Sequence, residues 1–158
     1  MEHILQCVSG SEMLSLLDGF SGYNQVLVSH GDKLNTTFNT KWGTYTYRKM
    51  PFGLINVDAT FQRAMDIDFR GLINISVVVY MDDITVYSYH GRDHIYHLRQ
   101  IFERCQRYGI SLNPKKSIFA VTEGKLLRHI LSKEGIVIDL ERIETIMRIQ
   151  PPANKNAM

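Results

Sequence analysis

The spacing of apolar and polar residues predicts short strands over the first third of the chain. An apolar run at 13–17 ends at Asp18 and is followed by Gly19 and Gly22, which is typical of a strand that stops and turns. Three further stretches are rich in Val, Thr, Tyr and Phe and are separated by turn residues. They predict antiparallel strands at 25–29, 36–40 and 44–48.

Helical spacing of apolar residues begins after this β-rich part. It predicts a helix at 59–69, a longer amphipathic helix at 93–108 that Gly109 closes, and a last helix at 140–149 that Pro151 stops.

A tight hairpin is predicted between the first two of these helices. The run at 76–80 is apolar and β-branched, 84–87 alternates, and Asp82 and Asp83 fall between them. Short strands are expected to follow the long helix, at 117–121, 125–131 and 136–138. Because hairpins dominate, the pattern indicates an α+β fold, an antiparallel sheet with helices packed on one face.

Length and composition are those of one globular domain. The chain has 158 residues, of which 44% are hydrophobic and 22% charged. No apolar run approaches the roughly 20 residues that a membrane span needs. Cys7 and Cys105 lie far apart, without a metal-binding spacing or a secretory signal before them. We therefore expect a soluble, intracellular protein with no membrane partner.

Charge is distributed unevenly along the chain. The formal net charge is only +2, but the segment 92–128 is rich in Lys and Arg and contains few acids. Its basic residues are Arg92, Arg99, Arg104, Arg107, Lys115, Lys116, Lys125 and Arg128. The segment is either a solvated helix face or a surface for phosphate contacts.

Asp82 and Asp83 are the first candidates for chemistry. Adjacent carboxylates repel each other unless a cation lies between them, and a hairpin tip lets both face one side. Carboxylate oxygens suit a hard ion such as Mg²⁺, and two such ions, with Asp18 as a third ligand, can catalyse an in-line phosphoryl displacement. An ordinary surface turn is the alternative.

Two other groups of residues have a chemical and a structural interpretation. Three histidines are spaced for one helix face but lack further metal ligands, so we interpret them as surface residues: His90, His94 and His97. Three aromatic residues could stack on bases, but alternation along a strand favours packing: Trp42, Tyr45 and Tyr47.

Several segments, read in order, resemble one family. They are 17–25, 50–54 with 59–63, 80–84, 86–88 and 112–116. The chain resembles the reverse transcriptase domain of Ty3/gypsy-type LTR retrotransposons, as a fragment of a plant-like pol polyprotein, over about residues 1–149. The ordered set is far more specific than any single motif.

This resemblance implies a catalytic centre. Asp18, Asp82 and Asp83 would hold two Mg²⁺ ions, with Mn²⁺ as a substitute, and the Gly19 carbonyl would be a further ligand. Lys116 would protonate the leaving pyrophosphate or offset its charge; as an exposed turn lysine it would have no such role.

The resemblance also implies binding residues. Tyr23 would lie under the incoming sugar and exclude a 2′-hydroxyl, unless it is a core tyrosine. Phe52, Gly53 and Gln62 would contact the incoming nucleotide, although a Pro-Phe-Gly turn can be purely structural. Six residues would contact primer or template: Arg63, Tyr80, Met81, Leu127, Arg128 and His129.

The implied function is that of an RNA-directed DNA polymerase that transfers nucleotides from dNTPs to a primer 3′-hydroxyl. Its partners would be an RNA or DNA template with primer, dNTPs, and the fingers, thumb and RNase H regions of a pol polyprotein. It would act in the cytoplasm, in a virus-like particle. Residues 1–150 would form the palm, with partial fingers and a primer-grip hairpin, and 151–158 a linker to a missing downstream region. A catalytically inert nucleic-acid-binding remnant and a two-metal phosphohydrolase are the alternatives.

The chain departs from the family pattern at several positions. Only 17 residues precede Asp18, so the upstream fingers segment is expected to be missing. Asp58 stands where Pro or Gly is usual, and a carboxylate buried there without a partner would be costly. Arg128 replaces a usual Gly, whose backbone conformation Arg does not readily adopt, and Ser117 replaces a usual Cys.

Overall fold

A computed structural model describes residues 2–20, 22–138 and 147–148. Of the last helix expected at 140–149, only Met147 and Arg148 are described, and both are helical. The rest of that helix and the expected linker at 151–158 lie outside the described residues. Within the described ranges, no helix is long and apolar enough to cross a membrane.

A four-stranded antiparallel sheet forms the centre of the structure, in the order β4-β5-β1-β6. Its strands are β1 (Met13–Asp18), β4 (Val77–Tyr80), β5 (Asp83–Ser88) and β6 (Ile118–Val121). Strands β4 and β5 form the expected tight hairpin, in which Tyr80 pairs with Asp83 across a two-residue turn. The predicted strand ending at Asp18 is confirmed as β1.

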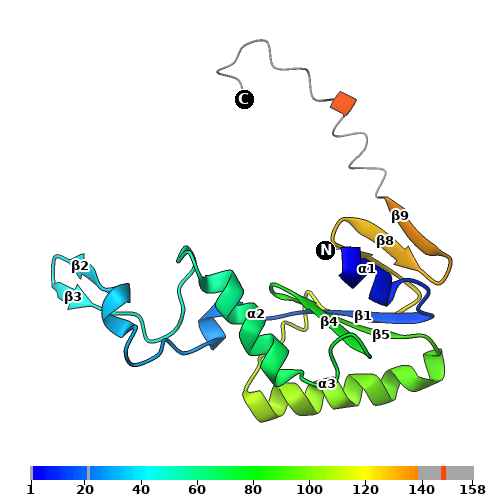
Figure 1. Ribbon diagram of the computed structural model, residues 1–158, viewed down its shortest axis with the longest axis horizontal. Helices are drawn as coiled ribbons and strands as arrows, with labels where there is room; N and C mark the ends of the chain where they lie inside the picture. The colour runs from blue at the N-terminus through cyan, green and yellow to red at the C-terminus, as the bar shows by residue number, and fades with distance from the viewer. Residues whose placement is uncertain (1, 21, 139–146, 149–158) are drawn as a thin grey trace.

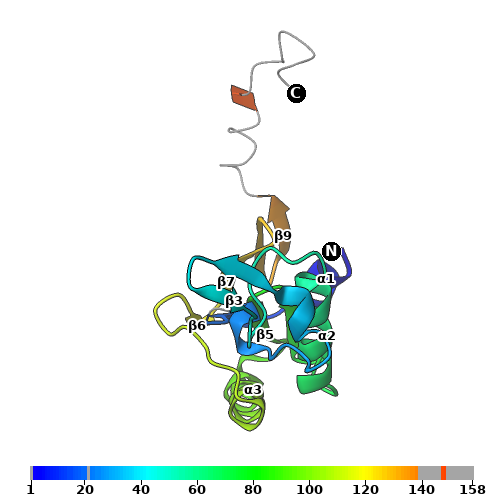
Figure 2. The same ribbon diagram turned by 90° about the vertical axis from the view of Figure 1, so that its left-hand side faces the viewer.

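Two long helices cover one face of this sheet (Figures 1 and 2). Helix α2 (Val57–Asp68) contributes Phe61 and Met65 to a buried cluster, and α3 (His94–Tyr108) contributes Ile101 and Cys105. Gly109 closes α3 with a φ of 70°, in the left-handed conformation that glycine adopts without strain. Both helices and this terminus agree with the sequence-based prediction.

The opposite face of the sheet is covered by elements from both ends of the chain. Helix α1 (Glu2–Val8), which the sequence analysis did not predict, packs there through Leu5 and Val8. A second antiparallel sheet, β7 (Glu123–Leu126), β8 (His129–Ser132) and β9 (Gly135–Ile138), lies beside it in Figure 1. The central sheet is therefore enclosed on both sides.

His94 joins α3 to the sheet, and its interpretation as a surface residue was wrong. Its side chain is fully buried, with Nε2 2.7 Å from Ser15 Oγ and Nδ1 2.8 Å from Ser88 Oγ. Burial, followed by the charge of His97, lowers the pKa of the His94 imidazole. His94 is thus a structural residue that connects β1, β5 and α3.

The β-rich region after β1 is less regular than expected. Residues 25–29 do not form a strand: a 3₁₀ helix, η1 (Gly22–Gln25), is followed by a single bridge between Leu27 and Lys49. The chain contains two further 3₁₀ helices, η2 (Lys33–Thr36) and η3 (Gly91–Asp93). Two short strands follow η2. These strands, β2 (Phe38–Thr40) and β3 (Gly43–Tyr45), form a hairpin that extends away from the rest of the molecule (Figure 1).

The single strand expected at 125–131 is in fact a hairpin. Leu126 pairs with His129, so Leu127 and Arg128 form a two-residue turn between β7 and β8. Both have positive φ, 50° and 64°. Tight turns of this kind favour Asn and Gly, and neither residue is present to signal one. The concern that Arg128 occupies a backbone shape suited to glycine is therefore supported.

Replacing Arg128 by glycine should stabilise the protein. The left-handed conformation costs a non-glycine residue about 1–2 kcal/mol, part of which is offset by the greater freedom of glycine in the unfolded chain. We expect Arg128→Gly to raise the free energy of unfolding by about 1 kcal/mol, measured by urea titration. Arg99→Gly, in the exposed middle of α3, should lower it by about the same amount. An equal loss in both variants would contradict the turn conformation.

Candidate active site

The carboxylates of Asp18, Asp82 and Asp83 come from one end of the central sheet. Asp18 is the last residue of β1 and pairs directly with Asp83, the first residue of β5. The Gly19 amide donates to the Asp82 carbonyl at 2.8 Å. The sheet register thus brings the two acidic segments, far apart in the sequence, side by side.

Two residues of the loop that contains Lys115 and Lys116 hold Asp18 in place. The Asn113 amide donates to the Asp18 carbonyl at 2.8 Å, and the Asp18 amide donates to Ser117 Oγ at 3.2 Å. Ser117 Oγ in turn donates to the Asn113 carbonyl at 2.7 Å. The hydroxyl of Ser117, present in place of a usual Cys, is therefore an acceptor for Asp18, a role that the sequence analysis missed.

The side chains of Asp18 and Asp83 point to the face of the sheet opposite α2 and α3. Side chains alternate along a strand, and Leu17 and Ile84, their neighbours, pack in the cluster under those helices. Approach to the two carboxylates is therefore from the side of α1 and the β7–β9 sheet.

This orientation divides the basic segment at 92–128. Its first part belongs to α3, on the far face, where the Arg104 guanidinium donates to the carbonyls of Asp68 and Arg70. Of the second part, Lys116 lies beside Asp18. The segment is therefore not one continuous phosphate-binding surface.

Asp82 lies in the turn between β4 and β5, with its carboxylate against Gly22. A Cβ atom on Gly22 would lie 1.9 Å from Asp82 Oδ1 and 2.7 Å from its Cγ, so a side chain at this position would overlap the carboxylate. Asp82 Oδ1 is buried and has no hydrogen-bond partner. Met81, the other turn residue, has a φ of 54°, a conformation that strains a side chain other than glycine.

Gly22→Ala should therefore destabilise the protein. Overpacking of this kind costs about 1–3 kcal/mol, because either the turn or η1 must shift. Gly31→Ala is the matched control, since a Cβ there would meet nothing within 4 Å. Chemical denaturation of both variants checks this prediction, and equal unfolding midpoints would show that Asp82 is not packed against Gly22.

The charges at this end of the sheet are only partly balanced. Burial, then the charges of Asp18, Asp83 and Asp58, raises the pKa of Asp82. Burial and Asp18 likewise raise the pKa of Asp83. The Lys116 ammonium, 3.8 Å from Asp18 Oδ2, acts in the opposite direction on both. Additional positive charge at this end of the sheet would therefore stabilise the ionised carboxylates.

These residues match a divalent cation in chemical type and backbone position. Carboxylate and carbonyl oxygens are the ligands that Mg²⁺ prefers. The side chains, however, do not converge: among the described residues, no three His, Cys, Asp or Glu groups gather closely enough to hold an ion. The carboxylate of Asp82, turned toward Gly22, would have to rotate to join the other two.

Tyr23 lies next to this site, in the core cluster under α2. Its ring makes edge contacts with Phe52 and Phe61, with centroids 5.1 Å and 5.2 Å away. Burial, then a hydrogen bond to Asp58, raises the pKa of Tyr23. Asp58 itself is exposed in the first turn of α2, where a negative charge is favourable. Its carboxylate is therefore not buried without a partner.

The other expected nucleotide and template residues surround this cluster. Phe52 and Gly53 are exposed, and Gly53 has a φ of 91°, which explains a glycine there. Gln62 Nε2 on α2 donates to the Val79 carbonyl at 3.3 Å and to Asp66 Oδ1 at 3.2 Å, which ties α2 to β4. Arg63, the next residue, is exposed.

The expected primer residues form two groups. Tyr80 and Met81 adjoin the acidic turn itself. Leu127 packs in the cluster beside α1, and His129 Nδ1 donates to the Leu127 carbonyl at 2.9 Å. With Arg128 between them, these residues lie on the face of the sheet toward which Asp18 and Asp83 point, as a separate hairpin.

The sequence and the fold are both similar to known proteins. Residues 2–131 match the family described as reverse transcriptase (RNA-dependent DNA polymerase). The chain is 30% identical, over 152 residues, to the retrovirus-related Pol polyprotein from transposon 412 of Drosophila melanogaster, covering 96% of this chain and 12% of that protein. It is also 30% identical, over 149 residues, to the corresponding polyprotein from transposon gypsy, covering 94% and 14%. The chain thus spans less than a sixth of the length of these relatives.

Among solved structures, one similar chain is the foamy viral protease-reverse transcriptase dRH in complex with double-stranded DNA. The TM-score is 0.84 at 20% identity, and the match covers 98% of this chain and 27% of that one. At this identity the likeness concerns the fold, and it confirms the expected α+β palm architecture.

Proposed function

Because the chain belongs to the reverse transcriptase family, we propose that it is the catalytic part of an RNA-directed DNA polymerase that extends a primer 3′-hydroxyl with dNTPs. One observation carries this proposal: Asp18 pairs with Asp83 while the Gly19 amide donates to the Asp82 carbonyl, so the backbone positions of the three acids lie together at one sheet end. Burial, and then the charges of neighbouring aspartates, raises the pKa of Asp82 and of Asp83, and bound cations would stabilise the ionised carboxylates against both effects.

In this proposal, Asp18, Asp82 and Asp83, with the Gly19 carbonyl, would hold two Mg²⁺ ions, which Mn²⁺ could replace. Such ions, when bound, stabilise the attacking and leaving oxygens of a phosphoryl transfer. Lys116 offsets charge on the departing pyrophosphate or donates a proton to it, and its position beside Asp18 supports this role.

The neighbouring residues bind the nucleotide in this proposal. Tyr23 closes the floor of the sugar site, and its packing between Phe52 and Phe61 would keep the ring from moving aside for a 2′-hydroxyl. Phe52, Gly53 and Gln62 would border the nucleotide.

The six expected strand-contact residues would bind primer and template. They are Arg63, Tyr80, Met81, Leu127, Arg128 and His129. The chain would work with the fingers, thumb and RNase H regions of a longer pol polyprotein, in intracellular virus-like particles. The similarity to a small share of each Pol polyprotein relative supports work within a longer polyprotein.

Primer extension tests the function. With a DNA primer on an RNA template, one matching dNTP and Mg²⁺, we expect templated addition of a nucleotide that stops when EDTA is added. Binding of the primed template without extension would instead favour an inert remnant. The orientation of the Asp82 carboxylate toward Gly22, away from the other two acids, is what an inert remnant would retain. Release of phosphate from nucleotides without extension would favour a phosphohydrolase.

A further inference from the structure

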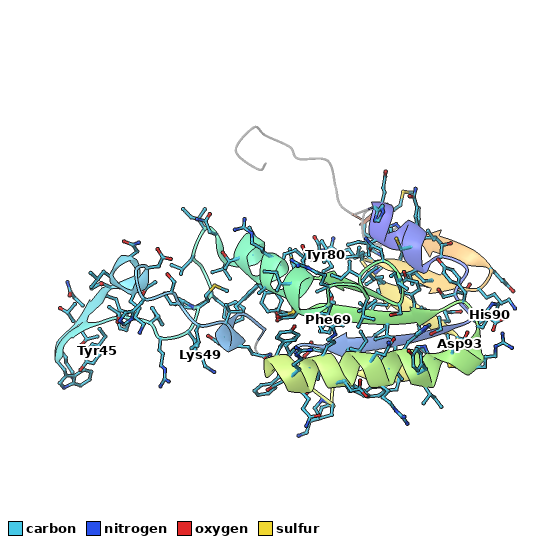
Figure 3. The ribbon with its side chains drawn as sticks, turned by 60° about the horizontal axis from the view of Figure 1, so that its bottom comes forward. Tyr45, Lys49, Phe69, Tyr80, His90 and Asp93 are labelled. Carbon is cyan, nitrogen blue, oxygen red and sulfur yellow. The ribbon has the colours of Figure 1, made fainter. Side chains whose placement is uncertain are left out.

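The β2–β3 hairpin presents aromatic side chains to solvent at the far end of the molecule (Figures 1 and 3). Phe38 pairs with Tyr45 across the strands, and the ring of Tyr47, two residues after β3 ends, also contacts Phe38. We call Phe38, Tyr45 and Tyr47 the aromatic face; they are 39%, 49% and 41% exposed. Trp42, in the turn, is 77% exposed. Tyr45 and Tyr47 thus pack against Phe38, as the alternation predicted, but they do so on an exposed surface, and Trp42 lies in the turn rather than on a strand.

Within the aromatic face, Phe38 stacks on Tyr45 and is tilted against Tyr47. Phe38 lies 6.1 Å from Tyr45 at an interplanar angle of 28°, and 4.9 Å from Tyr47 at 36°. Ring pairs in cores more often meet edge to face, as Tyr23 does with its two neighbours. Flat rings held side by side on an open surface are suited to stacking against other planar groups.

The hairpin and its flanking residues carry an excess of positive charge, although Asp32 lies just before them. Residues 33–50 contain Lys33, Lys41, Arg48 and Lys49 and no Asp or Glu. Lys41 Nζ lies 4.2 Å from the centre of the Trp42 ring, and no carboxylate of the described residues forms an ion pair with Lys41, Arg48 or Lys49. An apolar protein partner would not require these three basic side chains, whereas a polyanion with planar groups would use both features.

We propose that the aromatic face, together with Trp42 and Lys41, binds single-stranded nucleic acid by stacking on unpaired bases. Aromatic rings beside cations that contact phosphates bind single strands with little dependence on sequence. A duplex would not fit, because its bases are stacked on one another and present only their edges. That the strand is an unpaired stretch of template rests on the proposed function; the binding itself does not require the acidic site.

Trp42 gives a direct measurement, because it is the single tryptophan of the chain. Titration of the full chain with a 12-nucleotide oligo(dT) or oligo(U) should quench its fluorescence to saturation. Blunt duplex DNA of the same length should give little quenching. The two oligonucleotides distinguish DNA from RNA, and raising the salt concentration should weaken the binding of either. Absence of quenching by both single strands, or equal quenching by the duplex, would overturn the proposal.

Variants separate stacking from other contacts. Tyr45→Ala and Tyr47→Ala should each weaken binding by about 5- to 100-fold, while the corresponding Phe variants should bind almost normally. Tyr96→Ala, at a 62% exposed tyrosine on α3, is the matched control and should have no effect. Lys41→Gln keeps the ring cluster and should reduce the slope of log affinity against log salt by about 0.7. Unchanged binding in the alanine variants, or equal losses in the Phe variants, would rule out stacking.

Failure of this proposal is distinguishable from failure of the polymerase. Asp82→Asn changes the acidic site only and should leave the quenching unchanged. A chain that binds oligonucleotides at the hairpin but never extends a primer would keep this proposal and refute the proposed activity. If the unmodified chain extends primers and the Tyr45→Ala variant binds oligonucleotides normally, the proposed activity stands and the stacking proposal is refuted.

Discussion

Asp82→Asn is expected to abolish nucleotide addition while making the folded protein more stable. Loss of one group that stabilises developing charge lowers a rate by about 100- to 1,000-fold, and Asp82 is proposed to do so by holding a cation. Single-turnover primer extension in Mg²⁺ measures this loss. Glu103→Gln, an exposed residue on the far side of α3, should extend primers at the normal rate.

The gain in stability follows from the sign of the pKa shift. Because the pKa of Asp82 is raised in the folded state, its ionised form is disfavoured there at neutral pH. The asparagine removes that penalty, so the free energy of unfolding at pH 7 without metal should increase. The difference should shrink as the pH falls through the raised pKa, and should vanish below about pH 4, where an unfolded aspartate is also protonated. A less stable variant at pH 7 would contradict the electrostatic description of the site.

Phe69→Ala should cause a large loss of stability. Phe69 follows α2 and is fully buried where α2, α3 and the central sheet meet (Figure 3). Truncation of a buried phenylalanine costs about 3–5 kcal/mol, through lost burial and the cavity that remains. Since a domain is typically stable by about 5–15 kcal/mol, this variant should retain only a small margin.

Urea denaturation followed by far-UV circular dichroism measures the effect. The matched control is Phe102→Ala on α3, whose ring is 41% exposed and contacts the ring of Phe119, which is 45% exposed. We expect the control to lose about 1 kcal/mol or less. Similar midpoints for both variants would show that the cluster under α2 is not the main core.

The sequence predicted well those parts whose structure depends on local pattern. The β4–β5 hairpin, with its apolar runs and acidic tip, and α3, with its three-and-four spacing and terminal Gly109, both have strong signals of this kind. The family resemblance added the expectation that Asp18 lies near Asp82 and Asp83, which spacing alone does not determine. Membership of the family confirms that resemblance.

The errors arose where tertiary contacts override local pattern. Helix α1 is only seven residues long and gains its stability from packing through Leu5 and Val8. The β7–β8 turn has no turn-forming residue, so 125–131 read as one strand. His94 looked like any polar helix residue, and only the neighbouring Ser15 and Ser88 explain its burial. The position of Asp82 against Gly22 depends on two loops that meet only in the folded chain.

The one-sided approach to the acidic site has a practical consequence. Since α2 and α3 close the face of the sheet away from Asp18 and Asp83, the outward surface of α3 takes no part in the proposed chemistry. A fluorophore, an affinity tag or a surface tether attached at Arg99 or Glu103 would therefore leave the working face free. Immobilising the protein by this helix would present the acids and the hairpin of β7 and β8 to substrates in one uniform orientation.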